Sequence, residues 1–162
     1  VILICEHSKD ATMGLILNKP LYNFDTFQFL KKMKINTVTD IKSSPTFFGG
    51  PVHLNQGFII HSNEKQYKTS EDILDGVMIT SSEEILIDIS KDKSPEHAKI
   101  FLGCAVWDQG QLDNEILENS WIITNSDKDL IFHNNLEFSL WKKCLTGMGI
   151  DPSKLVSYSG SA

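Results

Sequence analysis

A cysteine, two histidines and a glutamate are the side chains whose chemistry could form a catalytic site. Cys104 ends a long apolar run and precedes a glycine-containing loop and a helix, whose N-terminus could stabilise a thiolate. His53 and His61 flank one loop and strand, and Glu115 lies in the helical segment beyond Cys104. No G-x-S-x-G motif or other fixed pairing of nucleophile and base is present. A small enzyme with a site assembled from these scattered residues stays an alternative, although a small buried hydrophobe is the simpler interpretation of Cys104.

Metal and phosphate chemistry have less support in the sequence. The five histidines show no H-E-x-x-H spacing and the three cysteines no C-x-x-C spacing. Four carboxylates gather around residues 108–118 and could suggest magnesium, but acidic residues near a helix start also simply stabilise the helix; they are Asp108, Asp113, Glu115 and Glu118. The glycines at residues 49–50 lack a nucleotide-binding spacing. The sequence predicts no metal, no cofactor and no assignable catalytic residue.

Charge and cysteine content narrow the classes of partner. The 162 residues carry a net charge of −6, and all fifteen positive residues are lysine. Arginine is the side chain that reads guanine edges and clamps phosphates in two-point contacts, so its absence disfavours direct binding of nucleic acid. Three cysteines without close pairing fit a reducing cytosol, and no apolar run reaches the roughly 20 residues that span a membrane. Because the chain begins with Val1 inside a strand pattern, we expect its true start to be missing.

Hydrophobic periodicity predicts one α+β domain over residues 1–162, in which strands outnumber helices. Strands are predicted at residues 1–5, 13–17, 46–48, 57–61, 77–80, 99–106, 121–124 and 130–132. About four helices are predicted, at residues 26–34, 83–90, 111–119 and 136–145. Asn23 or Asp25 could cap the first helix, and Ser81 with Glu84 has the spacing of a capping box before the second. The near-continuous apolar run at residues 99–106 is the predicted central strand.

Three polar loops between these elements are the predicted binding residues, because loops on a rigid scaffold commonly carry function. The first loop is Asn18, Lys19 and Pro20; the second is Gly49, Gly50 and Pro51; the third is Trp107, Gly110 and Gln111, with Glu115 just beyond it. If they converge in space, they form the predicted site.

Three stretches of sequence resemble the AlgH/YqgE family of bacterial proteins. They are M-G-L-I-L-N-K-P at residues 13–20, F-F-G-G-P-V at residues 47–52, and G-Q-L-D-N-E-I at residues 110–116, which leads to Trp121. Residues 57–62 and 75–78 are also similar to that family, so the resemblance runs essentially from end to end. One departure is Val106, where the family pattern usually has glycine before the tryptophan.

The resemblance implies a bacterial cytosolic protein whose sheet is bent, mixed or antiparallel, and partly barrel-like. It also implies an N-terminal stretch of a couple of dozen residues ahead of Val1. It supplies no activity, since the label of transcriptional regulator attached to some members comes from genetics and not from a DNA-binding motif. A non-enzymatic cytosolic regulatory or binding protein, with a protein or small molecule as its partner, is the favoured interpretation. Direct regulation of transcription on DNA stays an alternative.

Overall fold

The computed structural model describes residues 1–26, 28, 31, 45–91, 93, 95–132 and 138–155. The strands are β1 (Ile2–His7), β2 (Ala11–Ile16), β3 (Thr46–Phe48), β4 (Val52–Ser62), β5 (Glu71–Leu74), β6 (Val77–Thr80) and β7 (Ala98–Asp108). The helices are α2 (Glu83–Ile89), α3 (Gln111–Leu117), α4 (Lys128–Phe132) and α5 (Phe138–Gly147), followed by the 3-10 helix η1 (Pro152–Lys154). None of the described helices is long and apolar enough to cross a membrane.

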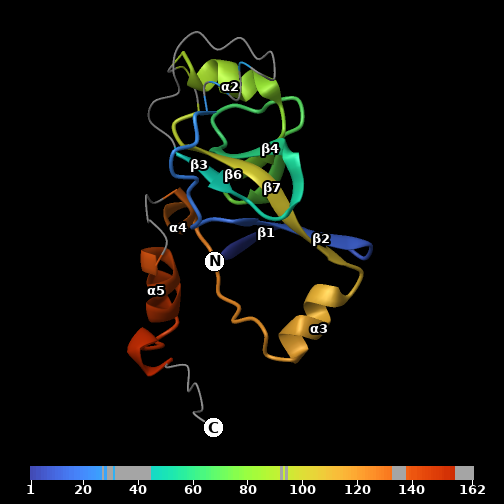
Figure 1. Cartoon of the computed structure of the whole chain (residues 1–162), viewed down its shortest axis with the longest axis vertical. Coiled ribbons are helices and arrows are strands. Elements are labelled where there is room, and N and C mark those ends of the chain that lie inside the picture. The colour runs from blue at the N-terminus through green and yellow to red at the C-terminus, as the bar shows by residue number, and fades with distance from the viewer. Residues whose placement is uncertain are drawn as a thin grey trace.

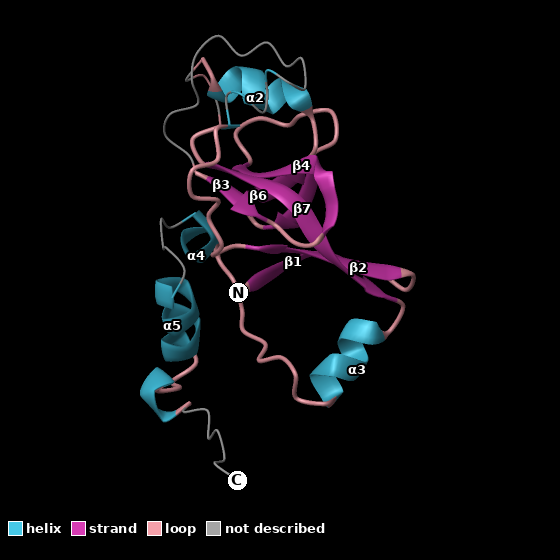
Figure 2. Cartoon of the chain, viewed as in Figure 1, coloured by secondary structure: helices cyan, strands magenta, loops and turns pink. Residues whose placement is uncertain are grey.

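The strands form one seven-stranded sheet (Figures 1 and 2). Six of them follow the order β1-β2-β7-β4-β6-β5, and β3 pairs with β7 outside this order. β4 occupies one edge of β7, while β3 and then β2 follow one another along its opposite edge. The β3–β7 pair is parallel and the other strand pairs are antiparallel. The predicted α+β class, the bent and partly barrel-like mixed sheet and the central place of residues 99–106 are therefore confirmed.

Around Gly103 the pairing of β7 with β4 is irregular, because β4 shifts register between Val52 and Gly57. At this bulge, β7 reverses which of its side chains face the core. Gly103 has a φ of +69°, a left-handed conformation that glycine adopts without strain. Phe101, before the bulge, and Cys104, after it, both point into the main core. The two residues are three positions apart, whereas in a regular strand only residues an even number of positions apart share a face. Trp107 therefore lies on the outer face of the sheet, where regular alternation from Phe101 would have turned it inward.

The sheet buries three apolar clusters, one on its inner face and two on its outer face. The inner cluster joins side chains of β1, β2, β3, β4, β6 and β7 to Ile131 of α4 and Leu140 of α5. On the outer face, α2 packs Ile85 and Leu86 onto β4 and β7, and α3 packs Leu112 beside Trp107. α3 thus depends on the part of β7 that follows the bulge.

Several predicted elements are confirmed and others are corrected. The strands near residues 1–5, 13–17, 46–48, 57–61 and 77–80 and the helices near residues 83–90, 111–119 and 136–145 are present. The predicted strand at residues 121–124 is wrong, because this stretch is an irregular loop that pairs with no described strand. Residues 130–132 belong to α4 and not to a strand, and β5 was not predicted. Most of the predicted helix over residues 26–34 lies outside the described residues.

Two helix caps differ in detail from the predicted ones. The side chain of Ser82, and not that of Ser81, accepts a hydrogen bond from the Glu84 N–H at the start of α2. Of the two residues proposed to cap the stretch at residues 26–34, Asp25 fills the role, since its carboxylate accepts the Gln28 N–H at 2.8 Å.

Candidate binding surface

The first two predicted loops lie side by side and serve the packing of the backbone. Phe48 donates its N–H to the carbonyl oxygen of Lys19 at 2.8 Å, and Pro20 forms an isolated bridge with Phe47. Behind them, a Cβ atom on Gly49 would lie 2.2 Å from the carbonyl oxygen of Gly103. Glycine is needed here because the loop and the bulge of β7 approach more closely than a side chain allows.

The side chains of this pair of loops are otherwise held by neighbours in the fold. The amine of Lys19 lies 4.4 Å from the centre of the Phe48 ring. The side-chain oxygen of Asn18 accepts a hydrogen bond from the N-terminal amine of Val1 at 2.8 Å, while Pro51 is exposed. Within the described residues, these contacts make the loops a structural junction between β2, β3 and β7.

The third loop lies farther along β7 and gathers a different set of residues. Trp107 is about 10 Å along the strand from Cys104, given a rise of about 3.3 Å per residue. The structure therefore does not bring all three predicted loops to one place. It does bring together Trp107, Gly110, Gln111 and Glu115, since Gly110 caps the start of α3 and Gln111 and Glu115 lie one turn apart on that helix.

Glu115 is the centre of this group. Its carboxylate accepts hydrogen bonds from the indole N–H of Trp107 at 3.1 Å, the side-chain amide of Gln111 at 2.8 Å and the indole N–H of Trp121 at 2.7 Å. The two tryptophan rings meet edge to face with centroids 6.0 Å apart. The hydrogen bonds from Trp121 and then Gln111 lower the pKa of the Glu115 carboxyl, so the group is an anion with its donors in place.

The Trp121 contact fixes the course of the chain that follows α3. Residues 118–127, which we call the bridging segment, run from α3 to α4 below the sheet as an open loop (Figure 1). At the far end, the Asp127 carboxylate accepts the Leu130 N–H at 2.7 Å and so caps α4. Between these two anchors, residues 122–125 are exposed. A groove of about 550 Å³ separates the segment from α5, and its lining includes Ile123, Lys143 and Met148.

Val106 does not disturb this surface. It lies within β7 opposite Met13 and its side chain is 39% exposed. A strand position with an outward side chain accepts a β-branched residue readily, so valine in place of the glycine usual in the family leaves the local backbone regular.

The residues proposed for a catalytic site are dispersed. Cys104 is buried in the inner cluster, and burial raises its pKa, which favours the thiol over the reactive thiolate. His61 is paired with Ala98 near the other end of β7, His53 is exposed, and Glu115 belongs to the tryptophan group. No group of three or more His, Cys, Asp or Glu side chains in the described part of the chain could hold a metal ion.

His61 is hydrogen-bonded to Ser70, but this pair stabilises the β4–β5 connection. His61 Nδ1 lies 2.9 Å from the Ser62 carbonyl oxygen and must donate to it, so Nε2 accepts the hydroxyl of Ser70 at 3.0 Å. Burial lowers the pKa of His61, in keeping with this neutral form. Ser70 also accepts the Tyr67 N–H at 2.9 Å, and His61 is fully buried. A substrate could not reach the base.

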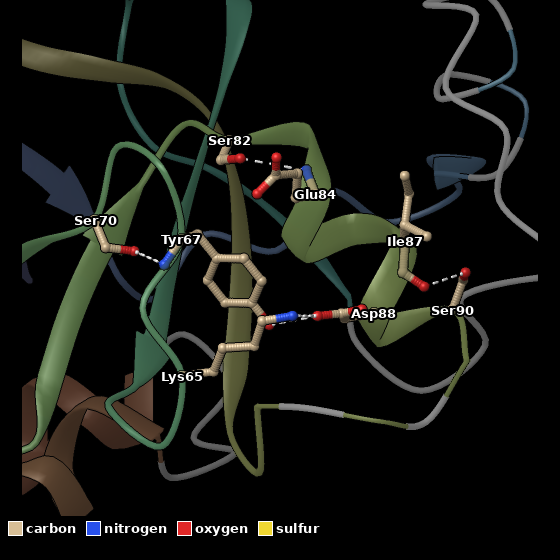
Figure 3. Close-up of polar contacts among 8 residues, drawn as sticks. All are labelled: Lys65, Tyr67, Ser70, Ser82, Glu84, Ile87, Asp88 and Ser90. Atoms are coloured by element: carbon tan, nitrogen blue, oxygen red, sulfur yellow. Dashed lines mark hydrogen bonds and ion pairs between the residues drawn. The ribbon is translucent and has the colours of Figure 1, made fainter.

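A polar cluster beside α2, away from α3, is likewise explained by folding. Figure 3 shows Lys65 and Tyr67 of the β4–β5 connection converging on Asp88 of α2. The Tyr67 hydroxyl donates to the carboxylate at 3.2 Å, and Lys65 both pairs with Asp88 and lies 4.9 Å from the Tyr67 ring centre. The hydrogen bond from Lys65 lowers the pKa of Asp88. These contacts tie the connection to α2.

Sequence reasoning missed the exposed apolar residues of the candidate surface. Trp121, Ile122 and Ile123 fall in the strand predicted at residues 121–124, in which alternate side chains would be buried. Their exposure could have been suspected from Asn119 and Ser120 on one side and Asn125 and Ser126 on the other, since polar residues on both sides isolate the apolar stretch from any neighbouring strand.

The fold places the chain among small α+β proteins with a bent, barrel-like sheet, and here that sheet carries an exposed apolar segment beyond its central strand. A sequence profile of the AlgH-like family matches residues 1–153, and this chain belongs to that family. A UPF0301 protein of Pectobacterium carotovorum is 36% identical over 166 residues, which cover all of this chain and 88% of the relative. A UPF0301 protein of Xanthomonas campestris is also 36% identical, with 100% and 86% covered.

Solved structures agree with this assignment. The AlgH protein from Pseudomonas aeruginosa superposes with a TM-score of 0.80 at 25% identity, covering 99% of this chain and 85% of its own. A protein from Corynebacterium diphtheriae superposes with a TM-score of 0.69 at 20% identity, covering 99% and 82%, and shares the fold. The names of these relatives state no reaction and no ligand.

Proposed function

We propose that this chain is a non-enzymatic binding protein of the cytosol, which recruits a protein partner through α3 and the bridging segment. The observation that carries the proposal is the exposure of three large aliphatic side chains around an anchored tryptophan. Leu117 is 79% exposed, Ile122 56% and Ile123 63%. Neighbouring apolar side chains left in water on an ordered segment are typical of a protein–protein interface.

Trp121 is suited to anchor such an interface. It is 39% exposed, while its N–H is held by Glu115 and its ring by Trp107. Tryptophan residues that are both held in place and partly open are frequent energetic centres of interfaces, because binding them loses little side-chain freedom.

The two alternative functions have weaker support. An enzyme would need Cys104, His61 and Glu115 to meet, and they lie along the length of β7 instead. Direct regulation on DNA would need a basic face, and the chain has a charge of −6 with no arginine. Its three free cysteines support the reducing cytosol as its location.

A comparison of captured proteins would test the proposal. The 162-residue chain, Ile123→Glu and Leu54→Glu would each be immobilised, and the proteins retained from a bacterial lysate would be quantified. Leu54 is a matched control because it is 53% exposed and lies on β4, outside the candidate surface. We expect the wild type and Leu54→Glu to retain the same one or few proteins. The retained amount of these proteins should fall at least tenfold with Ile123→Glu.

Retention that is equal on all three baits, or absent from all three, would contradict the proposal. A panel of thermal shifts with nucleotides, duplex DNA and divalent metals completes the test, because a ligand at about 100 times its dissociation constant stabilises a protein by about 2.7 kcal/mol. A shift with duplex DNA that disappears in salt would support the transcriptional alternative instead.

A further inference from the structure

Resting on the proposed function, we infer that the partner binds as an added β-strand along residues 121–126, and that the added strand alternates basic with apolar side chains. Strand addition of this kind combines hydrogen bonds between main chains with pockets for every second side chain. Three features of the bridging segment support it.

The first feature is an unpaired main chain. In the described structure, the backbone N–H groups of residues 121–126 donate to no protein acceptor, and the segment joins no strand of the sheet. Its composition is nonetheless that of a strand, since tryptophan, two isoleucines and threonine follow one another at residues 121–124. A segment with strand-forming residues and open hydrogen-bonding groups has the properties of an exposed sheet edge.

The second feature is order in advance of binding. Trp121 is held by Glu115 at one end and Asp127 caps α4 at the other, so residues 122–126 already span the gap between two fixed points. Once straightened against a partner strand, these six residues offer about 20 Å of edge at about 3.3 Å per residue. A partner would therefore order little of this chain on binding, which favours affinity.

The third feature is charge. Residues 106–127 contain five carboxylates and no lysine: Asp108, Asp113, Glu115, Glu118 and Asp127. Glu115 is occupied by its three donors and Asp113 lies 3.8 Å from His7, while Asp108 and Glu118 are exposed. Lys143 of α5 lines the far side of the groove. Basic residues of the partner should therefore lie toward α3, where they complement the acidic groups and speed association.

The charge pattern also favours a different protein over a second copy of this chain. A second copy of this chain would bring its own net charge of −6 to the interface, and like charges across an interface oppose association. A basic and apolar strand meets no such repulsion.

The test is selection from a library of displayed random peptides of about twelve residues on the full 162-residue chain, with Ile123→Glu and Leu54→Glu as comparison baits. We expect the enriched peptides to bind Leu54→Glu like the wild type, to lose binding to Ile123→Glu, and to alternate lysine or arginine with β-branched or aromatic residues. N-methylation of every second amide in a selected peptide should weaken binding at least tenfold. Bound peptide should slow amide hydrogen exchange at Ile122, Ile123 and Thr124 in the protein.

The outcomes separate this inference from the proposed function. Peptides that need Ile123 but are acidic, helical or insensitive to N-methylation would overturn strand addition while leaving the binding surface intact. A library with no Ile123-dependent peptide would overturn both. Sedimentation equilibrium tests the remaining occupant: a dimer of the wild-type chain that Ile123→Glu dissociates would replace the partner strand with a second copy.

Discussion

The β-bulge at Gly103 gives a prediction whose magnitude follows from the structure. In Gly103→Ala the new Cβ would lie 2.4 Å from the carbonyl oxygen of Gly50 and 2.8 Å from that of Val52. Both oxygens belong to the backbone, so β4 or β7 must move by several tenths of an ångström at least. A left-handed conformation costs a residue with a Cβ about 1 kcal/mol, and forcing an extra methyl into a packed interior costs about 1–3 kcal/mol. We expect the free energy of unfolding to fall by about 3 kcal/mol.

Urea unfolding followed by tryptophan fluorescence measures the effect, and Gly57→Ala is the matched control. Gly57 lies on β4 opposite Leu102, next to the bulge, yet a Cβ there would come no closer than 3.9 Å to the Phe101 carbonyl oxygen. This substitution should change the free energy of unfolding by less than about 1 kcal/mol, and its smaller unfolded-state entropy favours stabilisation. Equal effects of the two substitutions, or a loss below about 1 kcal/mol for Gly103→Ala, would refute the bulge as the reason for glycine.

Three further predictions concern buried polar groups. Burial lowers the pKa of Lys99, which is 5% exposed, to about 8. Because the unfolded chain binds this proton up to about pH 10.5, the free energy of unfolding in urea should rise between pH 8 and 10.5, and Lys99→Met should lack this rise. Burial lowers the pKa of His61, so its neutral form stabilises the fold above about pH 6.5 and this contribution is lost as the pH falls; at pH 6.5 the imidazole nitrogen shifts in NMR should report a larger neutral fraction than in a free imidazole, and a mostly charged ring would contradict the assignment. Among the described residues, the buried Ser126 hydroxyl has no hydrogen-bond partner, so Ser126→Ala should leave the free energy of unfolding unchanged or raise it by about 1 kcal/mol, whereas a loss of more than about 1 kcal/mol would reveal a partner.

The elements that sequence predicted well are those whose local pattern and tertiary role agree. The run at residues 99–106 is apolar on both faces, and β7 is covered on both. The sequence did not predict β5, because the charged residues Glu71 and Asp72 make this edge strand resemble a loop. Asp75-Gly76 before Val77 is nonetheless a strong hairpin signal. For α4, the short apolar stretch at residues 130–132 fits either a strand or a helix, and the cap from Asp127 decides for the helix.

The candidate site was predictable only in part, for a reason that the bulge explains. Residue types and loop positions indicated Trp107, Gln111 and Glu115, and they do meet. The face of the sheet that they occupy depends on the reversal at Gly103. That reversal follows from one backbone dihedral angle, which hydrophobic periodicity does not predict. The strand predicted at residues 121–124 shows a second difficulty: the residue types favour a strand, but a strand also needs a neighbour, and none of the described strands pairs with this stretch.

The bridging segment is fixed at its two ends, and between them its side chains make few contacts with the described core. Its sequence can therefore change without loss of the fold. Substitutions at Ile122, Ile123 or Thr124 touch no cluster that stabilises the fold. Different lineages could therefore change the preferred partner there while keeping the same scaffold. An engineer could use the same freedom, replacing residues 122–125 with a foreign recognition sequence held extended between Trp121 and Asp127.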